Sequence, residues 1–201
     1  MSRVAQLVVM AKRPELGRVK TRLAKGMGAV AATRFYRQTT YDLIRRMSAD
    51  ARWQTVLALS PDRAVHEAGL WPRDVPRVGQ GTGDLGARMG RLMRDLPAGP
   101  VVIVGSDIPD ISRDHVAAAF EALGQNDAVI GPSDDGGYWL IGLRRGTRVP
   151  EIFDNVRWSG EHARADTLWN ATREGLSLAA LPTLTDIDTH DDYLRWKARQ
   201  T

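Results

Sequence analysis

Short runs of apolar residues alternate with amphipathic segments along this chain of 201 residues. Uninterrupted apolar runs are typical of strands buried on both faces of a sheet, whereas apolar positions three and four residues apart are typical of helices packed on a sheet. The runs predict strands at residues 4–10, 55–60, 101–104, 127–132, 138–143 and 176–181. The helical spacing predicts helices at residues 29–47, 62–70, 85–96, 112–123, 161–174 and from 191 onward.

The order of these elements indicates an α/β fold. The strands at 127–132 and 138–143 are joined by only five residues, which is too short for a helical crossover, so these two strands must be antiparallel. Most other strands are separated by helices, which favours parallel pairing. We therefore expect a three-layer α/β/α sandwich with a mixed, mostly parallel sheet, formed by a single domain over residues 1–201.

The strand at 101–104 is the element around which the chain is organised. It consists of β-branched residues only, and Gly105 ends it. Ligands bind beyond the carboxyl ends of the strands in an open α/β sheet, so Asp107 should point into the site. Pro109 restricts the backbone of the residue before it and holds this turn in one shape. Asp107 is therefore a candidate metal ligand, although it is equally suited to cap the helix that starts near Ser112.

The composition excludes several classes of protein. The chain has no cysteine, which excludes disulfides and thiolate chemistry. Its net charge of +4 comes from Lys and Arg scattered among Asp and Glu, whereas a nucleic-acid-binding protein concentrates its basic residues in one stripe. The apolar run at 7–11 is far shorter than the roughly 20 residues of a membrane span and lacks a signal-peptide cleavage pattern. We expect an untargeted cytoplasmic enzyme that binds neither nucleic acid nor membranes.

A basic segment follows the first predicted strand. Four cations lie there within eight residues: Arg18, Lys20, Arg22 and Lys25. Arginine binds phosphate oxygens in a bidentate way and lysine supplies a mobile point charge, so the segment suits an anionic group. It lacks the Gly-x-x-x-x-Gly-Lys-Ser/Thr pattern and is therefore no P-loop. The alternative is a solvated basic loop without a ligand.

A Gly-x-Gly-x-x-Gly pattern spans residues 81–86 and opens a predicted helix. This pattern occurs in dinucleotide-binding folds, where it follows a strong central strand. Pro72 and Pro76 precede it here and argue against such a strand. An NAD-binding oxidoreductase therefore stays an alternative, not the preferred interpretation.

The string Asp-Asp-Gly-Gly-Tyr-Trp at residues 134–139 is the most distinctive in the chain. Paired carboxylates beside two glycines allow close approach of a sugar or a phosphorylated ligand, and Tyr138 or Trp139 can stack on a sugar ring. The alternative is an Asp-Gly hairpin turn between the flanking strands, although such a turn does not require the second Asp and the second Gly.

Four acidic residues occur within residues 186–192, just before the last predicted helix. Thr189 and Asp191 can cap that helix and favour its positive end. Asp188 stays free to join Asp107 as an oxygen ligand, since Mg²⁺ commonly takes one or two protein carboxylates together with substrate phosphates and water. The histidines show no metal-ligand spacing.

Seven strings, taken together and in this order, carry a resemblance to a known family. They are Lys12-Arg13-Pro14, residues 17–23, 83–89, 105–109, 131–143, Trp158-Ser159 and residues 186–189. They resemble the DUF2064 family, which is glycosyltransferase-A-like and similar to 2-phospholactate guanylyltransferase and, more distantly, to molybdenum cofactor guanylyltransferase. The resemblance spans nearly the whole chain, but the first loop has fewer glycines than that of the guanylyltransferases, which leaves the nucleobase open.

The resemblance implies a nucleotide-diphospho-sugar transferase fold. In such a fold the first loop wraps the phosphates of a nucleotide, and the aspartate after the central strand holds a divalent metal, Mg²⁺ or Mn²⁺. The implied nucleotide-binding residues are Lys12, Arg18, Lys20, Arg22, Gln80 and Gly86, the last two near the base or ribose. The implied metal ligands are Asp107 and Asp188. The implied sugar- or acceptor-binding residues are Asp134, Asp135, Gly136, Gly137, Tyr138 and Trp158.

We therefore interpret the chain as a metal-dependent transferase that uses a nucleotide or nucleotide-sugar donor and a small phosphorylated or sugar-like acceptor. In a nucleotidyltransferase, the acceptor attacks the α-phosphate of a nucleoside triphosphate while the metal, Lys20 and Arg22 neutralise charge. In a glycosyltransferase, the metal holds the leaving diphosphate, and Asp134 or Asp135 contacts the sugar or acts as a base. The predicted catalytic residues are Lys20, Asp107 and Asp135. A noncatalytic nucleotide-binding module is a further alternative, and a homodimer is compatible with the sequence.

Overall fold

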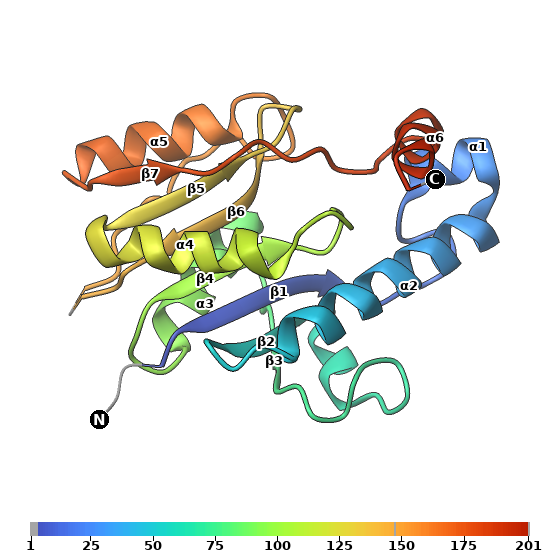
Figure 1. Ribbon diagram of the computed structural model, residues 1–201, viewed down its shortest axis with the longest axis horizontal. Coiled ribbons are helices and arrows are strands. Elements are labelled where there is room, and N and C mark those ends of the chain that lie inside the picture. The colour runs from blue at the N-terminus through green and yellow to red at the C-terminus, as the bar shows by residue number, and fades with distance from the viewer. Residues whose placement is uncertain (1–3, 147, 201) are drawn as a thin grey trace.

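The computed structural model describes residues 4–146 and 148–200, and its central feature is a seven-stranded sheet in the order β3-β2-β1-β4-β6-β5-β7 (Figure 1). The strands are β1 (Gln6–Lys12), β2 (Gln54–Ser60), β3 (Arg77–Gly79), β4 (Val101–Gly105), β5 (Ala128–Pro132), β6 (Tyr138–Leu143) and β7 (Leu178–Ala180). Strand β6 runs antiparallel to its neighbours β4 and β5, and the other described pairs are parallel. The mixed, mostly parallel sheet predicted from the sequence is thus confirmed.

Helices cover both faces of the sheet and complete three layers (Figure 1). Helices α2 (Ala29–Ser48) and α4 (Arg113–Gln125) pack on one face, and α3 (Leu85–Asp95) and α5 (Ala163–Arg173) pack on the other. Successive side chains of a strand point to opposite faces, so Leu7 and Val9 join the core under α2 whereas Val8 joins the core under α3. This two-sided burial explains why the strands read as uninterrupted apolar runs.

Two further helices lie beside one end of α2. Helix α1 (Thr21–Met27) follows the first loop and packs against α6 (His190–Ala198), which comes from the opposite end of the sequence (Figure 1). Phe35 of α2 contacts the rings of Tyr193 and Trp196 edge-on, with ring centroids 5.2 and 5.6 Å away. Segments from the two ends of the sequence therefore meet near the edge at which β1 and β4 end.

Three local features differ from the sequence prediction. Residues 21–27 were expected to be loop but form α1, which buries only Leu23 and so carries no apolar repeat. The helix expected at 62–70 is the five-residue 3₁₀ helix η1 (Asp62–His66). Strand β3 was not predicted, because its three residues hold a single apolar side chain, Val78, and come just after Pro76.

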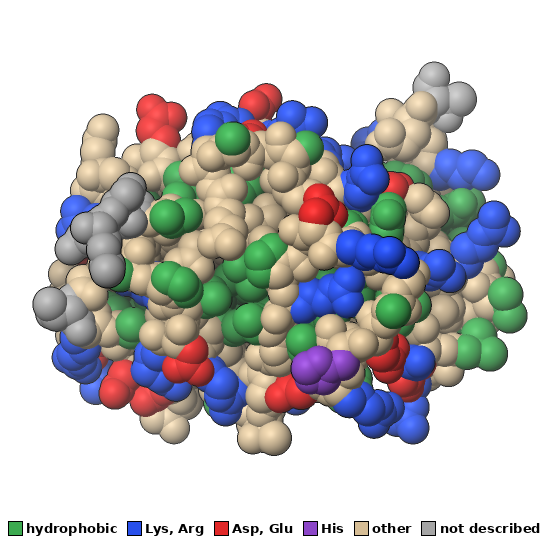
Figure 2. All heavy atoms as spheres, turned by 90° about the horizontal axis from the view of Figure 1, so that it is seen from below, with side chains coloured by type: hydrophobic (Ala, Val, Ile, Leu, Met, Phe, Trp, Pro, Cys, Tyr) green, Lys and Arg blue, Asp and Glu red, His purple; other side chains and the backbone are tan. Residues whose placement is uncertain are grey.

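Basic and acidic side chains are mixed on the face of the molecule drawn in Figure 2. The scattered charges of the sequence predict this mixing. In this described part of the chain, no helix has both the length and the apolar composition that a membrane crossing needs.

Candidate active site

A cavity of about 580 Å³ opens at the carboxyl ends of β1 and β4. Ligands bind at this edge in open α/β sheets. Eight of the residues predicted to form the site line the cavity: Lys12, Arg18, Lys20, Arg22, Gln80, Asp107, Tyr138 and Asp188. Six do not line it: Gly86, Asp134, Asp135, Gly136, Gly137 and Trp158.

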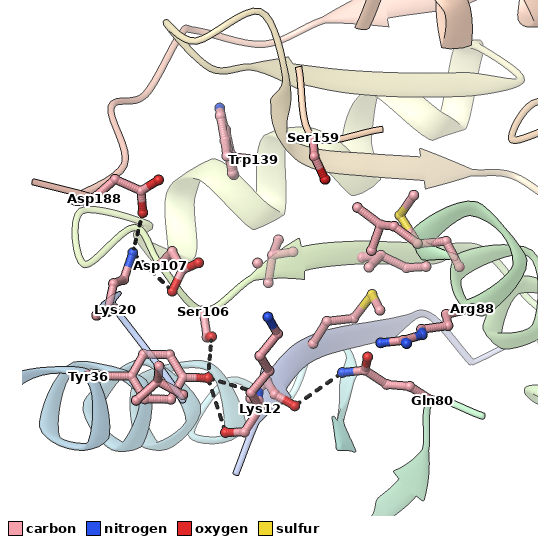
Figure 3. Close-up of a pocket in the computed structure, with 18 of the residues that line it drawn as sticks. Lys12, Lys20, Tyr36, Gln80, Arg88, Ser106, Asp107, Trp139, Ser159 and Asp188 are labelled. Carbon is pink, nitrogen blue, oxygen red and sulfur yellow. Dashed lines mark hydrogen bonds and ion pairs between the residues drawn. The ribbon is translucent and has the colours of Figure 1, made fainter. Parts of the chain in front are cut away.

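The charged centre of the cavity is the ammonium group of Lys20, held between two carboxylates (Figure 3). Nζ of Lys20 donates to Oδ1 of Asp188 at 2.8 Å and lies 3.2 Å from Oδ1 of Asp107. The Lys20 side chain is only 5% exposed, whereas the Asp107 and Asp188 side chains are 50% and 38% exposed. The two acids that the sequence suggests as partners thus converge on one cation, and that cation is a lysine.

The surroundings of Lys20 keep it positively charged. Burial lowers the pKa of its ammonium group, but the charges and hydrogen bonds of Asp107 and Asp188 more than offset this effect. The net result is a pKa above the usual value for lysine. Lys20 is therefore a permanent positive charge in the cavity wall at neutral pH.

Local backbone geometry holds this cluster in place. Lys20 has φ 47° and ψ 46°, the left-handed conformation, and it is the N-cap of α1. This conformation costs a non-glycine residue about 1 kcal/mol or more, so the surrounding contacts must impose it. On the opposite side, the carbonyl of Asp107 accepts from the N–H of Ile187 at 3.3 Å. The N–H of Asp188 donates to Oδ2 of Asp192 in the first turn of α6 at 3.2 Å.

Tyr36 is a central cavity residue that the sequence analysis missed. Its hydroxyl group accepts from the N–H of Lys12 at 2.8 Å, and it lies 3.1 Å from the Lys12 carbonyl oxygen and 3.2 Å from Oγ of Ser106 (Figure 3). Burial and the charge of Asp107 raise the pKa of Tyr36 to about 12, so the hydroxyl stays neutral and braces β1 against the end of β4. In the sequence, Tyr36 stands at an inward-facing position of the helix predicted at 29–47. A residue of the hydrophobic core would stand at the same kind of position, so the sequence does not distinguish the two roles.

Further cations face the cavity around this cluster. Lys12 points into it from the end of β1 and Arg88 from α3 (Figure 3). The side chains of Lys12 and Arg18 have no hydrogen-bond or ion-pair partner among residues 4–146 and 148–200. Arg22 lies 3.7 Å from the carboxylate of Asp188. This excess of positive charge fits a ligand with several negative charges, such as a polyphosphate.

Gln80, Gly86 and Trp158 make internal contacts. Gln80 is 4% exposed, and its Nε2 donates to the carbonyl oxygens of Ala11 and Ala58 at 3.1 and 2.9 Å. A Cβ on Gly86 would lie 2.8 Å from the Trp158 ring, so α3 and Trp158 pack in direct contact. Gly86 and Trp158 therefore support the cavity wall from behind, which differs from the positions expected near the base and the acceptor.

The Asp-Asp-Gly-Gly string forms the turn between β5 and β6. Oδ1 of Asp135 accepts from the N–H of Gly137 at 2.9 Å, and Oδ2 of Asp134 accepts from the Thr185 hydroxyl at 2.5 Å. Gly136 has φ 85°, a conformation that favours glycine. The structure therefore agrees with the hairpin alternative and does not bring Asp134 or Asp135 to the cavity wall.

The two aromatic residues after this turn reach the cavity only in part. Tyr138 lines the cavity, but its buried hydroxyl group accepts from Oγ1 of Thr167 at 3.4 Å, and burial raises its pKa. Trp139 is 2% exposed, and its indole N–H donates to the carbonyl of Pro182 at 3.1 Å. Trp139 is therefore a core residue rather than the sugar-stacking platform that the sequence suggested.

The carboxylates of this site fit a hard divalent cation. Mg²⁺ and similar ions prefer carboxylate oxygens, and Mg²⁺ needs only one or two of them when phosphates and water complete its shell. Asp107 and Asp188 supply two that already face one positive charge. Burial, together with the charge of Asp188, raises the pKa of a third carboxyl group, that of Asp186, to about 6. Within residues 4–146 and 148–200, no three His, Asp or Glu side chains come together as a metal site, so a metal bound by Asp107 and Asp188 would take its other ligands from substrate or water.

Comparison with solved structures identifies the fold. A crystal structure from Desulfovibrio desulfuricans, provisionally named a nucleotide-diphospho-sugar transferase, is 32% identical with a TM-score of 0.85 over 94% of this chain and 84% of that one. A Mycobacterium tuberculosis protein in complex with manganese shares the fold at 19% identity, with a TM-score of 0.55 over 97% of this chain and 98% of that one. The three-layer architecture expected from the sequence is confirmed.

Comparison with sequences identifies the family. The 2-phospho-L-lactate guanylyltransferase of Methanopyrus kandleri is 31% identical over 102 residues, which are 49% of this chain and 50% of that protein. The chain thus spans about half the length of this curated relative. The model of a family described as an uncharacterized protein conserved in bacteria, DUF2064, matches residues 43–160, which is more than half of the chain. The chain belongs to the DUF2064 family.

Proposed function

We propose that this protein is a metal-dependent nucleotidyltransferase, which transfers the nucleoside monophosphate of a nucleoside triphosphate to a small phosphorylated acceptor. The observation that carries this proposal is the cluster of Lys20, Asp107 and Asp188, in a cavity whose other charged side chains are all basic. Two carboxylates beside a basic wall suit a polyphosphate and its metal ion. The names of two relatives, a guanylyltransferase and a nucleotide-diphospho-sugar transferase, support the same class.

The proposed reaction is an in-line displacement at the α-phosphorus. An oxygen of the acceptor's phosphate attacks, the bond from the α-phosphorus to the bridging oxygen of the β-phosphate breaks, and pyrophosphate leaves with that electron pair. A divalent metal held by Asp107 and Asp188 would neutralise charge on the phosphate oxygens. Arg18 binds the triphosphate in a bidentate way, and Lys12 and Lys20 add point charges. The acceptor phosphate is already ionised at neutral pH, so the chain needs no general base.

Nucleotidyl transfer is favoured over glycosyl transfer by the position of the hairpin turn. The glycosyltransferase interpretation gives Asp134 or Asp135 contact with the sugar or the role of a base. Neither residue lines the cavity: Asp135 accepts from the N–H of Gly137 in its own turn, and Asp134 accepts from the Thr185 hydroxyl. The acids that do line it, Asp107 and Asp188, are those proposed to hold the metal.

The dinucleotide alternative conflicts with the start of α3. In a dinucleotide-binding fold, the pyrophosphate lies against the N-terminus of a helix that follows the glycines. Here Asp84 is the N-cap of α3, and its Oδ1 accepts from the N–H of Ala87 at 2.8 Å. A carboxylate thus stands where the pyrophosphate of NAD would have to bind.

Acceptor-dependent release of pyrophosphate tests the proposal. The protein is incubated with each common nucleoside triphosphate, with Mg²⁺ or Mn²⁺, and with 2-phospho-L-lactate or another small phosphorylated acid. A coupled pyrophosphatase assay reports the product. We expect release with at least one triphosphate, loss of release in Asp107→Asn, and no change in Asp95→Asn, whose side chain is exposed and does not line the cavity. Turnover of a nucleotide sugar without any pyrophosphate release would contradict the proposal.

A further inference from the structure

Lys20 holds the position in the cavity that a divalent cation would take. One ammonium group lies 2.8 Å from Asp188 and 3.2 Å from Asp107, and so offsets part of the charge of both carboxylates. The backbone of Lys20 is fixed as the N-cap of α1, where its carbonyl accepts from the N–H of Ala24 at 2.9 Å. The four-carbon side chain is flexible, so the ammonium group can move while the helix stays folded.

The ammonium group and a dication compete for the two carboxylates. A metal held by both acids would stand within a few ångströms of Nζ, and like charges at such a separation repel strongly where water screens them poorly. Only 5% of the Lys20 side chain is exposed, whereas half of the Asp107 side chain faces solvent and is open to an incoming ion. Repulsion therefore favours departure of the ammonium group when a metal enters.

The cavity offers Lys20 a second set of partners. Lys20 lines the same space as Lys12, Arg18 and Arg88, the basic side chains suited to the donor's phosphates. Phosphate oxygens at this wall can accept from the ammonium group in place of the carboxylates.

We propose, on the basis of the function proposed above, that Lys20 is an exchangeable counter-ion. It offsets part of the charge of Asp107 and Asp188 before the metal binds, and it moves to the donor's phosphates when the metal replaces it. Metal and nucleotide binding then support each other, because the metal occupies the carboxylates that Lys20 leaves and the nucleotide supplies the new partner of Lys20.

Binding of Mn²⁺ alone, without nucleotide, tests this exchange. Lys20→Met keeps an unbranched side chain of nearly the same length and removes its charge. Lys25→Met is a matched control because Lys25 is exposed on α1 and does not line the cavity. Titration calorimetry should show that Lys20→Met binds Mn²⁺ at least about tenfold more tightly than the wild type, since no charge-assisted hydrogen bond has to break first. Lys25→Met should match the wild type, and adding Asp107→Asn to Lys20→Met should remove the gain.

The results distinguish failure of the proposed Lys20 exchange from failure of the proposed function. Equal or weaker Mn²⁺ binding by Lys20→Met overturns the exchange, and the proposed function stands if the wild type still binds a nucleoside triphosphate with Mn²⁺. If the wild type binds no nucleoside triphosphate, the proposed function fails and the exchange fails with it.

A second measurement uses the unchanged protein and covers the case in which Lys20→Met does not fold. Amine acylation, read by mass spectrometry, should modify Lys20 slowly in the absence of metal and several-fold faster with saturating Mn²⁺, with Lys25 as the internal reference. Binding of Mn²⁺ without faster acylation of Lys20 overturns the exchange.

Discussion

Replacement of Asp186 by asparagine should stabilise the protein at neutral pH. Burial, with the charges of Asp188 and Asp135, raises the pKa of Asp186 from 3.8 to about 6. Because the folded-state pKa is the higher one, the folded chain keeps a proton that the unfolded chain has already released. The free energy of unfolding therefore falls as pH rises from about 4 to about 6, and it stays low above that range.

The size of the effect follows from the shift in pKa. A difference of about two pKa units corresponds to about 3 kcal/mol in a site fully shielded from water. Asp186 is only partly buried and water screens its neighbours, so we expect Asp186→Asn to gain about 1 to 2 kcal/mol at about pH 7.5. Asparagine has almost the same volume as aspartate, so the gain reports the charge rather than the packing.

Urea unfolding of the wild type and of Asp186→Asn at about pH 7.5 and about pH 4.5 measures this difference. The gain should shrink at the lower pH, because a protonated Asp186 no longer opposes folding. Asp95→Asn, at an exposed position, is the control and should show no pH-dependent gain. A gain of the same size at both pH values, or a loss at the higher one, would refute the reasoning.

Three further substitutions test the supports of the site. Gly86→Ala places a Cβ 2.8 Å from the Trp158 ring and should lower the free energy of unfolding, measured by urea unfolding, by about 1 to 3 kcal/mol. Unchanged stability would show that α3 and Trp158 are not tightly packed at this point. Trp196→Phe removes the indole N–H that donates to Asp110 at 2.9 Å. This loss should lower the free energy of unfolding by about 1 kcal/mol and speed hydrogen exchange in α6. Exchange at the wild-type rate would show that this hydrogen bond does not hold α6 in place. Arg18→Ala should leave the free energy of unfolding unchanged, because the Arg18 side chain has no partner among the described residues. The same change should weaken nucleoside triphosphate binding about tenfold and make that binding less dependent on salt concentration. Equal affinity would remove Arg18 from the phosphate-binding set.

The fold could be predicted largely from the sequence because the sheet is buried on both faces. Such strands read as uninterrupted apolar runs, and these runs located every described strand except β3. Short elements with little buried surface leave no such record. Strand β3 has a single apolar side chain, Val78, and α1 buries only Leu23, so neither carries a detectable pattern.

The acids of the candidate site could be predicted because topology places them. Asp107 follows the central strand, and Asp188 precedes a helix that returns to the same edge. Their joint pairing with Lys20 could not be predicted, because it depends on a left-handed backbone at Lys20 and on the packing of α6 against α1, where Gly26 lies directly against His190. Contacts between distant segments leave no local pattern.

The Asp-Asp-Gly-Gly string shows a different limit. Asp and Gly favour tight turns and also favour loops that approach ligands closely, so the residue types alone do not separate the two uses. Only the surrounding strands, β5 and β6, and the hydrogen bond from Gly137 to Asp135 identify the turn.

The central claim is that Asp107 and Asp188 together hold a metal ion on which nucleotide binding depends. Calorimetric titration of nucleoside triphosphates into the wild type and into Asp107→Asn, with Mn²⁺ and with a chelator, tests it most directly. We predict that the wild type binds at least one triphosphate tightly only when Mn²⁺ is present, and that Asp107→Asn loses this Mn²⁺-dependent binding while keeping the circular dichroism spectrum of the wild type. Equally tight binding by both proteins, with or without Mn²⁺, would contradict the claim.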